Sequence, residues 1–151
     1  MKSPLVILLL CVSNCLCQID NIGWPNPDEK QCLQRLSLDE KHIGELVMAY
    51  APGKLPDHDE DFSKFVHCRG IHMGIQNESG ELNFENLVNV VKYFPEGIFN
   101  KNAAEDSIVG GNLSTQTVEN CKKEVQGDNA GQTLIRMQNC IDNYLVKHFN
   151  S

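Results

Sequence analysis

The sequence lacks long apolar stretches, and this absence argues against a transmembrane helix. Its one uninterrupted apolar run, from Leu5 to Val12, is shorter than the roughly 20 residues that a transmembrane helix needs. The run follows a positively charged start, and Cys15-Leu16-Cys17 after it places small residues at the two positions that a signal peptidase recognises. This arrangement is typical of a secretory signal peptide. We therefore expect residues 1–17 to be removed, residues 18–151 to form one domain, and the protein to be secreted without membrane insertion.

Basic residues are also scarce. The chain has 13 Lys and Arg against 20 Asp and Glu, which gives a formal net charge of −7. Such a balance argues against nucleic acid or an anionic membrane as a partner. The sequence has no serine elbow, no metal-peptidase histidine pair and no phosphate-binding glycine loop. It also lacks the Cys-Cys-x-x-His run of a secreted phospholipase. We expect neither enzymatic activity nor a cofactor.

The five histidines do not form a metal-binding pattern. His67 and His72 are five residues apart, which is off the four-residue step that places two ligands on one face of a helix. His58 lies in the acidic run 57–61, but this run lacks the alternating oxygens and the glycine of a calcium loop. We expect the run to be a solvated helix start and predict no metal site.

The cysteines that remain after signal removal are even in number. In an oxidising compartment an even set indicates disulfides, and four cysteines allow three connectivities. A bridge between the last two is easy to close, because they lie on helices joined by a short turn at 126–128; the remaining pair would then form the other bridge. The four are Cys32, Cys68, Cys121 and Cys140. Two sequons, at Asn77 and Asn112, are acceptors for N-glycosylation.

No segment alternates convincingly between apolar and polar residues, so the fold class is all-α with about six helices. The first is expected from the Asn26 cap to Leu36, and the second from a capping box at Ser37-Leu38-Asp39-Glu40 to Pro52-Gly53. The acids 59–61 open a third, with the apolar residues Phe62, Phe65, Val66, Ile71 and Met73 facing inward.

Three further helices complete the prediction. Asn83 caps the fourth, which ends at Pro95, and a loop over 100–111 follows. Ser114 or Thr115 caps the fifth, which runs to Val125, and Asp128 caps the sixth. The inward faces of the fourth and sixth helices carry Phe84, Leu87, Val88, Val91, Phe94, Leu134, Met137, Ile141, Tyr144, Leu145 and Phe149.

Five phenylalanines and three methionines are among the apolar residues of the expected interior. Flat rings and flexible thioethers suit loosely specific apolar binding, although each of these residues taken alone fits an ordinary core better. Tyr50 or Tyr144 could offer a hydroxyl to a ligand, but a buried tyrosine bonded to the backbone is the preferred interpretation. The proposed walls are Phe62, Phe65, Phe84, Phe94, Phe99, Met48, Met73 and Met137.

The cysteine spacing resembles that of the insect odorant-binding protein family, whose six cysteines pair first with third, second with fifth and fourth with sixth. On this resemblance Lys64 and Gly131 stand at the second and fifth cysteines, with three residues between Lys64 and Cys68 and eight between Gly131 and Cys140. The missing cysteines are partners of one another, which is the pattern of the four-cysteine, or C-minus, subgroup. The 52 residues between Cys68 and Cys121 exceed the family's usual spacing, and the excess falls in 100–111.

The resemblance implies a secreted carrier for olfaction or another fluid. It implies an apolar cavity that holds an odorant, a pheromone, a fatty acid or a similar small hydrophobic ligand, with a membrane chemoreceptor as a further partner. Two alternatives remain open, a helical signalling or interaction protein with a solid core and a scavenger of amines. The residues expected to line the cavity are Phe62, Phe65, Val91, Phe94, Phe99, Met137, Ile141 and Tyr144.

Overall fold

The computed structural model describes residues 24–123 and 126–151, so the expected signal peptide lies outside the described residues. Within them the chain forms six α-helices and one 3-10 helix and no strand, which confirms the all-α prediction. The elements are α4 (Pro27–Arg35), α5 (Glu40–Met48), α6 (Glu60–His72), α7 (Phe84–Lys92), η1 (Glu96–Ile98), α8 (Gly111–Cys121) and α9 (Ala130–Phe149).

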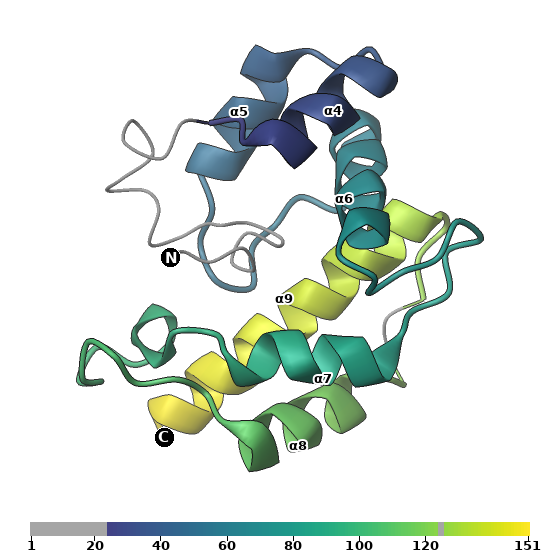
Figure 1. Ribbon diagram of the computed structural model, residues 1–151. Coiled ribbons are helices and arrows are strands. Elements are labelled where there is room, and N and C mark those ends of the chain that lie inside the picture. The colour runs from purple at the N-terminus through teal and green to yellow at the C-terminus, as the bar shows by residue number, and fades with distance from the viewer. Residues whose placement is uncertain (1–23, 124–125) are drawn as a thin grey trace.

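The last helix holds the arrangement together. Figure 1 shows α9 running diagonally through the molecule, with α6 beside its beginning, α4 and α5 beyond α6, and α7 and α8 on the side of its second half. Helix α9 packs most extensively against α6, and α7 packs mainly against α8. No helix in the described part of the chain has both the length and the apolarity to cross a membrane.

Two predicted caps are confirmed in detail. The Asn26 side chain accepts a hydrogen bond of 2.8 Å from the N–H of Glu29, and the Glu29 carboxylate accepts one of 2.8 Å from the N–H of Asn26. This reciprocal capping box satisfies two N–H groups that the first helical turn leaves unpaired. The Asn83 side chain accepts likewise from the N–H of Asn86, so α7 begins where the sequence predicted.

Two other caps were assigned to the wrong neighbour. Helix α5 is capped by Asp39, whose side chain accepts from the N–H of Lys41, whereas Ser37 lies two residues earlier at a positive φ of 53°. Helix α9 is capped by Asn129 and not by Asp128. Both errors have one cause: several adjacent residues could cap, and the packing of the helix decides which one faces the free N–H groups.

Helix α8 begins earlier than predicted. It starts at Gly111 after Gly110, which has a φ of 88° and provides no side-chain cap. The expected caps Ser114 and Thr115 lie inside the helix and donate to the carbonyl of Gly111 at 2.8 and 3.0 Å. The helix ends at Cys121, and the predicted end at Val125 lies outside the described residues.

Both disulfides are confirmed. Cys32 on α4 is joined to Cys68 on α6, and Cys121 at the end of α8 is joined to Cys140 on α9. Each bridge therefore links two packed helices.

Many of the predicted inward residues are buried in the core. Met73, Phe84, Val88 and Phe149 are half-buried and pack against it, whereas Met48, Ile71 and Tyr144 do not belong to this apolar cluster. Met48, expected in the walls, is 49% exposed at the end of α5, and Ile71 is only half-buried near the end of α6. Each lies in the last turn of its helix, where the apolar stripe no longer faces a neighbour. The predicted loop is confirmed, because residues 100–110 contain no helix.

Candidate functional site

Seven of the eight residues expected to line a cavity lie in the interior. Phe62, Phe65, Val91, Phe94, Phe99, Met137 and Ile141 are at most 4% exposed and belong to one continuous apolar cluster. They come from α6, α7, the segment after α7, and α9. Tyr144 is half-buried, and its hydroxyl accepts only a long hydrogen bond of 3.5 Å from Asn120.

The rings of this interior form two groups. Phe65 packs edge-to-face on Trp24 at 5.9 Å and lies against Phe62 at 6.3 Å. Phe94 and Phe99 are stacked at 6.2 Å. Such pairs combine apolar burial with a preferred geometry. The single tryptophan was not among the predicted residues, because it precedes the first helix and has no helical neighbours that would mark it as inward.

A buried carboxylate was missed. Asp142 on α9 is 0% exposed, and its oxygens accept hydrogen bonds from the Tyr50 hydroxyl at 2.8 Å, the Gly53 N–H at 3.0 Å and the Gln138 amide. Burial raises the pKa of Asp142 to about 7, while these three donors act to lower it. The half-buried Tyr50 thus donates to a carboxylate, where the preferred interpretation was a bond to the backbone.

Polar side chains of α9 also hold the segment between α5 and α6. The Asn139 amide both donates to and accepts from the backbone of Leu55, at 2.9 and 2.8 Å. Gln132 donates to the carbonyl of Asp57 at 2.7 Å, and the Arg136 guanidinium lies 2.9 Å from the Asp57 carboxylate. The spacing 132, 136, 139 is one helical face, so a polar stripe on α9 could have been found from the sequence, although its partner could not.

A surface pocket of about 500 Å³, lined mainly by polar and charged residue types, opens between α6 and the start of α9. None of the predicted cavity residues lines it. Its residues are Asp57, His58, Glu60, Ser63, Lys64, His67, Asn129, Ala130, Gly131 and Gln132, and we call it the α6/α9 pocket. A second, smaller polar pocket of about 360 Å³ lies beside the turn after α6 and includes Ser79, Phe84 and Lys122.

Lys64 and Gly131, which the family resemblance places at two missing cysteines, line the α6/α9 pocket together. Gly131 packs directly on α6: a Cβ added to it would lie 1.8 Å from the carbonyl oxygen of Ser63. Lys64 points to the pocket rim, where its ammonium lies 3.0 Å from Glu60. The two positions are therefore brought to one junction between α6 and α9.

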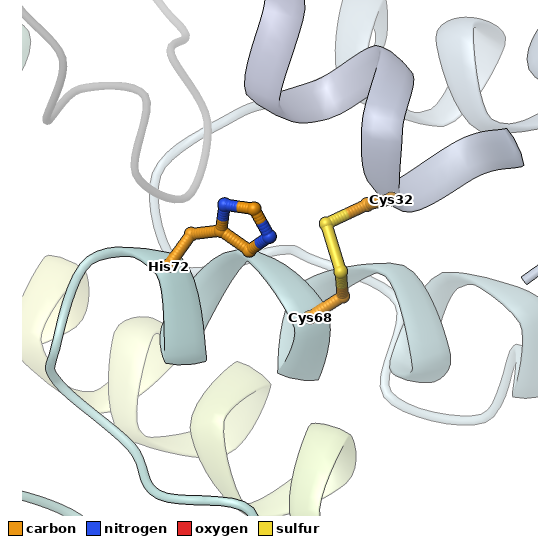
Figure 2. A group of neighbouring side chains, drawn as sticks. All are labelled: Cys32, Cys68 and His72. Atoms are coloured by element: carbon orange, nitrogen blue, oxygen red, sulfur yellow. A yellow bond between two sulfur atoms is a disulfide. The ribbon is translucent and has the colours of Figure 1, made fainter. Parts of the chain in front are cut away.

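In the described part of the chain, one group of three potential metal ligands is gathered, and Figure 2 shows it: His72 lies beside Cys32 and Cys68. The two sulfurs are joined in a disulfide, so neither can supply the thiolate that a metal requires. The ring of His72 lies 3.8 Å from Asp28. The group is therefore a disulfide with a neighbouring imidazole.

Both sequons are on the surface. Asn77 is exposed in the turn after α6, and Asn112 is exposed in the first turn of α8. Their hydroxyl residues differ, because Ser79 is exposed whereas Ser114 is fully buried.

Comparison with known proteins points to one group. No curated protein and no solved structure matches the chain significantly. The sequence model of the PBP/GOBP family, the insect odorant- and pheromone-binding proteins, matches residues 26–144. This span contains α4 to α8, most of α9 and both disulfides, and the chain therefore belongs to the PBP/GOBP family.

Proposed function

We propose that this protein is a secreted carrier, without catalytic activity, that holds a small hydrophobic molecule in its interior. The observation that carries the proposal is the family membership of residues 26–144, since this family consists of binding proteins. The interior supports it chemically, because its faces are formed by phenylalanine rings, aliphatic chains and Met137. A surface of this kind binds by shape and apolar contact.

The expected affinity is moderate. A ligand with about ten methylene groups gains roughly 8 kcal/mol on burial, and association costs at least about 4 kcal/mol of this. The remainder of about 4 kcal/mol corresponds to millimolar affinity, and a ligand with about five more buried methylene groups would reach the micromolar range. A carrier that must release its ligand needs binding in this range.

The test is displacement of a fluorescent apolar probe by long-chain alcohols and fatty acids. We expect saturable probe binding and competitive displacement, with a change of at least threefold in probe affinity for Phe94→Ala. Tyr93→Ala is the matched control: Tyr93 is the chain neighbour of Phe94 but is 58% exposed, so its removal should leave affinity within twofold. Absence of both probe binding and displacement would favour the alternative, an interaction protein with a solid core.

Secretion through the signal peptide at 1–17 is part of the proposal. It is supported by the two disulfides, which form in oxidising compartments. Expression in insect cells with mass spectrometry of the medium should give a mature chain that begins at Gln18. Retention of the intact chain inside the cells would contradict secretion. The same spectra would show whether Asn77 and Asn112 carry glycans.

We further propose that the chain belongs to the four-cysteine subgroup of the family. The proposal is supported by the meeting of Lys64 and Gly131 at the α6/α9 pocket. The contact between Gly131 and the Ser63 carbonyl leaves no room for a side chain, so this junction is built for close packing of backbones. Thiol titration of the secreted, unfolded protein should find no free cysteine before reduction and four after it.

A further inference from the structure

The α6/α9 pocket lies on the surface, and its use does not depend on the proposed carrier function of the interior. Three features of its lining can contact a bound group: the first turn of α9, the Ser63 hydroxyl and the His67 imidazole. Together they form a polar site for which the family membership gives no role.

The first feature is the N-terminus of a long helix. Helix α9 has 20 residues, and its first turn contains no acidic residue. The Asn129 cap accepts from the N–H of Gln132, which leaves the N–H groups of Ala130 and Gly131 without a hydrogen bond to any described residue. Free N–H groups and the positive end of the helix dipole attract an anion.

The second feature is a buried hydroxyl in the same pocket. Ser63 is only 4% exposed, lines the pocket and makes no side-chain hydrogen bond with the described residues. Its backbone touches Gly131, so the hydroxyl belongs to the same junction as the first turn of α9. With no partner among the described residues, this hydroxyl is available to a group that enters the pocket.

The third feature is a histidine whose proton position is fixed. The Gln76 amide donates to the carbonyls of Gly80 and Ala130, both at 2.9 Å. Its oxygen therefore faces His67, and Nδ1 of His67 at 2.8 Å must be the donor. Nε2 is then the acceptor of the neutral ring, and it can accept a hydrogen bond from the hydroxyl of a hydrogen phosphate or a similar group.

The negative charges in the lining repel an anion only weakly, because each of them is paired with a basic side chain. Two carboxylates are present, but Asp57 lies 2.9 Å from Arg136 and 3.1 Å from His58. The carboxylate of Glu60 lies 3.0 Å from Lys64. Each negative charge therefore has a basic partner, and screening by physiological salt, with a Debye length of about 8 Å, reduces the effect of the remaining acidic surface.

We propose that the α6/α9 pocket binds a small oxyanion, a carboxylate or a phosphate group, through the N–H groups of Ala130 and Gly131, the Ser63 hydroxyl and the His67 imidazole. The net charge of −7 makes affinity in the millimolar range the reasonable expectation for a free ion. A larger molecule that carries the group would bind more tightly by additional contacts.

The test is a titration of the whole mature protein with sodium phosphate and with sodium acetate, followed by amide chemical shifts in nitrogen-15 spectra. Sodium chloride at equal ionic strength serves as the reference. We expect saturable shifts at Ala130 and Gly131 with at least one of the two oxyanions, and the stronger one identifies the group. Shifts that grow linearly, that chloride reproduces, or that saturate only elsewhere would overturn the proposal.

Ser63→Ala should weaken binding by roughly threefold to tenfold, the effect of one hydrogen bond. Ser151→Ala, at the exposed C-terminus, is the control and should change nothing. Unchanged affinity in folded Ser63→Ala would contradict the site. If that variant does not fold, His67→Phe replaces it, because it keeps a ring of similar size and removes the imidazole nitrogens, with an expected loss of at least twofold and the same interpretation. Binding of the fluorescent apolar probe should be unaffected by phosphate, so failure here and failure of the carrier function are separate results.

Discussion

The hydroxyl of Tyr50 donates a hydrogen bond of 2.8 Å to the carboxylate of Asp142, 92 residues further along the chain. Tyr50 follows α5, and Asp142 lies within α9. The bond therefore joins the N-terminal helices to the last helix through a fully buried acid. Burial raises the pKa of the Asp142 carboxyl and thereby makes the stability of the protein depend on pH.

Asp142 should make the fold more stable in mild acid. Its pKa is raised from 3.8 to about 7 in the folded protein, so the folded state holds this proton more tightly than the unfolded state does. The contribution of Asp142 to the free energy of unfolding is fully present below pH 3.8. It is lost as the pH rises to about 7, at no more than about 1.4 kcal/mol per pH unit. Asp142→Asn should remove this dependence in urea unfolding at pH 4.5, 6 and 7.5.

The control for this measurement is Asp106→Asn, because Asp106 is exposed in the loop before α8. The free energy of unfolding of Asp142→Asn, relative to wild type, should improve as the pH rises. The same difference should stay constant for Asp106→Asn. A constant difference for Asp142→Asn as well would show that this carboxyl titrates as it does in the unfolded chain.

Tyr50→Phe should destabilise the protein by about 1 to 3 kcal/mol at pH 7.5. It removes one of the three donors to Asp142, and a buried charge that loses a donor retains its desolvation cost. Tyr93→Phe removes a hydroxyl from a residue that is 58% exposed and should be neutral. Thermal unfolding followed by circular dichroism measures both; equal melting temperatures for the two variants would mean that the Tyr50 hydroxyl contributes nothing.

Gly131→Ala should lower the free energy of unfolding, although it adds only one methyl group. The added methyl group would lie 1.8 Å from the carbonyl oxygen of Ser63, and backbone atoms can yield only if α6 and α9 move apart. Overpacking of this kind costs about 1 to 3 kcal/mol. Gly97→Ala adds the same group where nothing lies within 4 Å and should change the free energy of unfolding by less than about 1 kcal/mol. If both variants unfold at the same urea concentration, the close approach of the two helices does not limit stability.

The two disulfides should contribute similar amounts of stability. The bridges close loops with sequence separations of 36 for Cys32–Cys68 and 19 for Cys121–Cys140. In a chain-entropy estimate they are worth about 4 and about 3 kcal/mol respectively. Paired serine variants should each lower the urea midpoint, the Cys32/Cys68 pair slightly more. A much smaller loss for either pair would indicate that its loop is already restricted in the unfolded chain.

The α6/α9 junction shows what spacing can and cannot predict. The missing cysteine positions, Lys64 and Gly131, could be aligned from the intervals to Cys68 and Cys140, and the structure brings both to one pocket. The contact that replaces a covalent link there, between Gly131 and the backbone of Ser63, depends on how closely two helices approach. No local pattern encodes that distance.

The sequence by itself determined which segments form helices and favoured one pairing of the cysteines. Caps such as Asn26 and Asn83 act on residues within one helical turn, and the 3.6-residue repeat of apolar residues defines the buried face of each helix. Four cysteines on packed helices then leave few pairings that can close. These features depend on residues close together in the chain, so they can be predicted from one sequence.

Tertiary structure alone decided which polar groups are buried and what they meet. Asp142 interrupts an apolar face of α9, and nothing near it in the sequence indicates that Tyr50 and Gly53 donate to it. The same holds for Ser63 and for the first turn of α9, which form one pocket only because α6 and α9 pack together. A buried polar group is tolerated only when its partners are in place, and here those partners come from segments far apart in the chain.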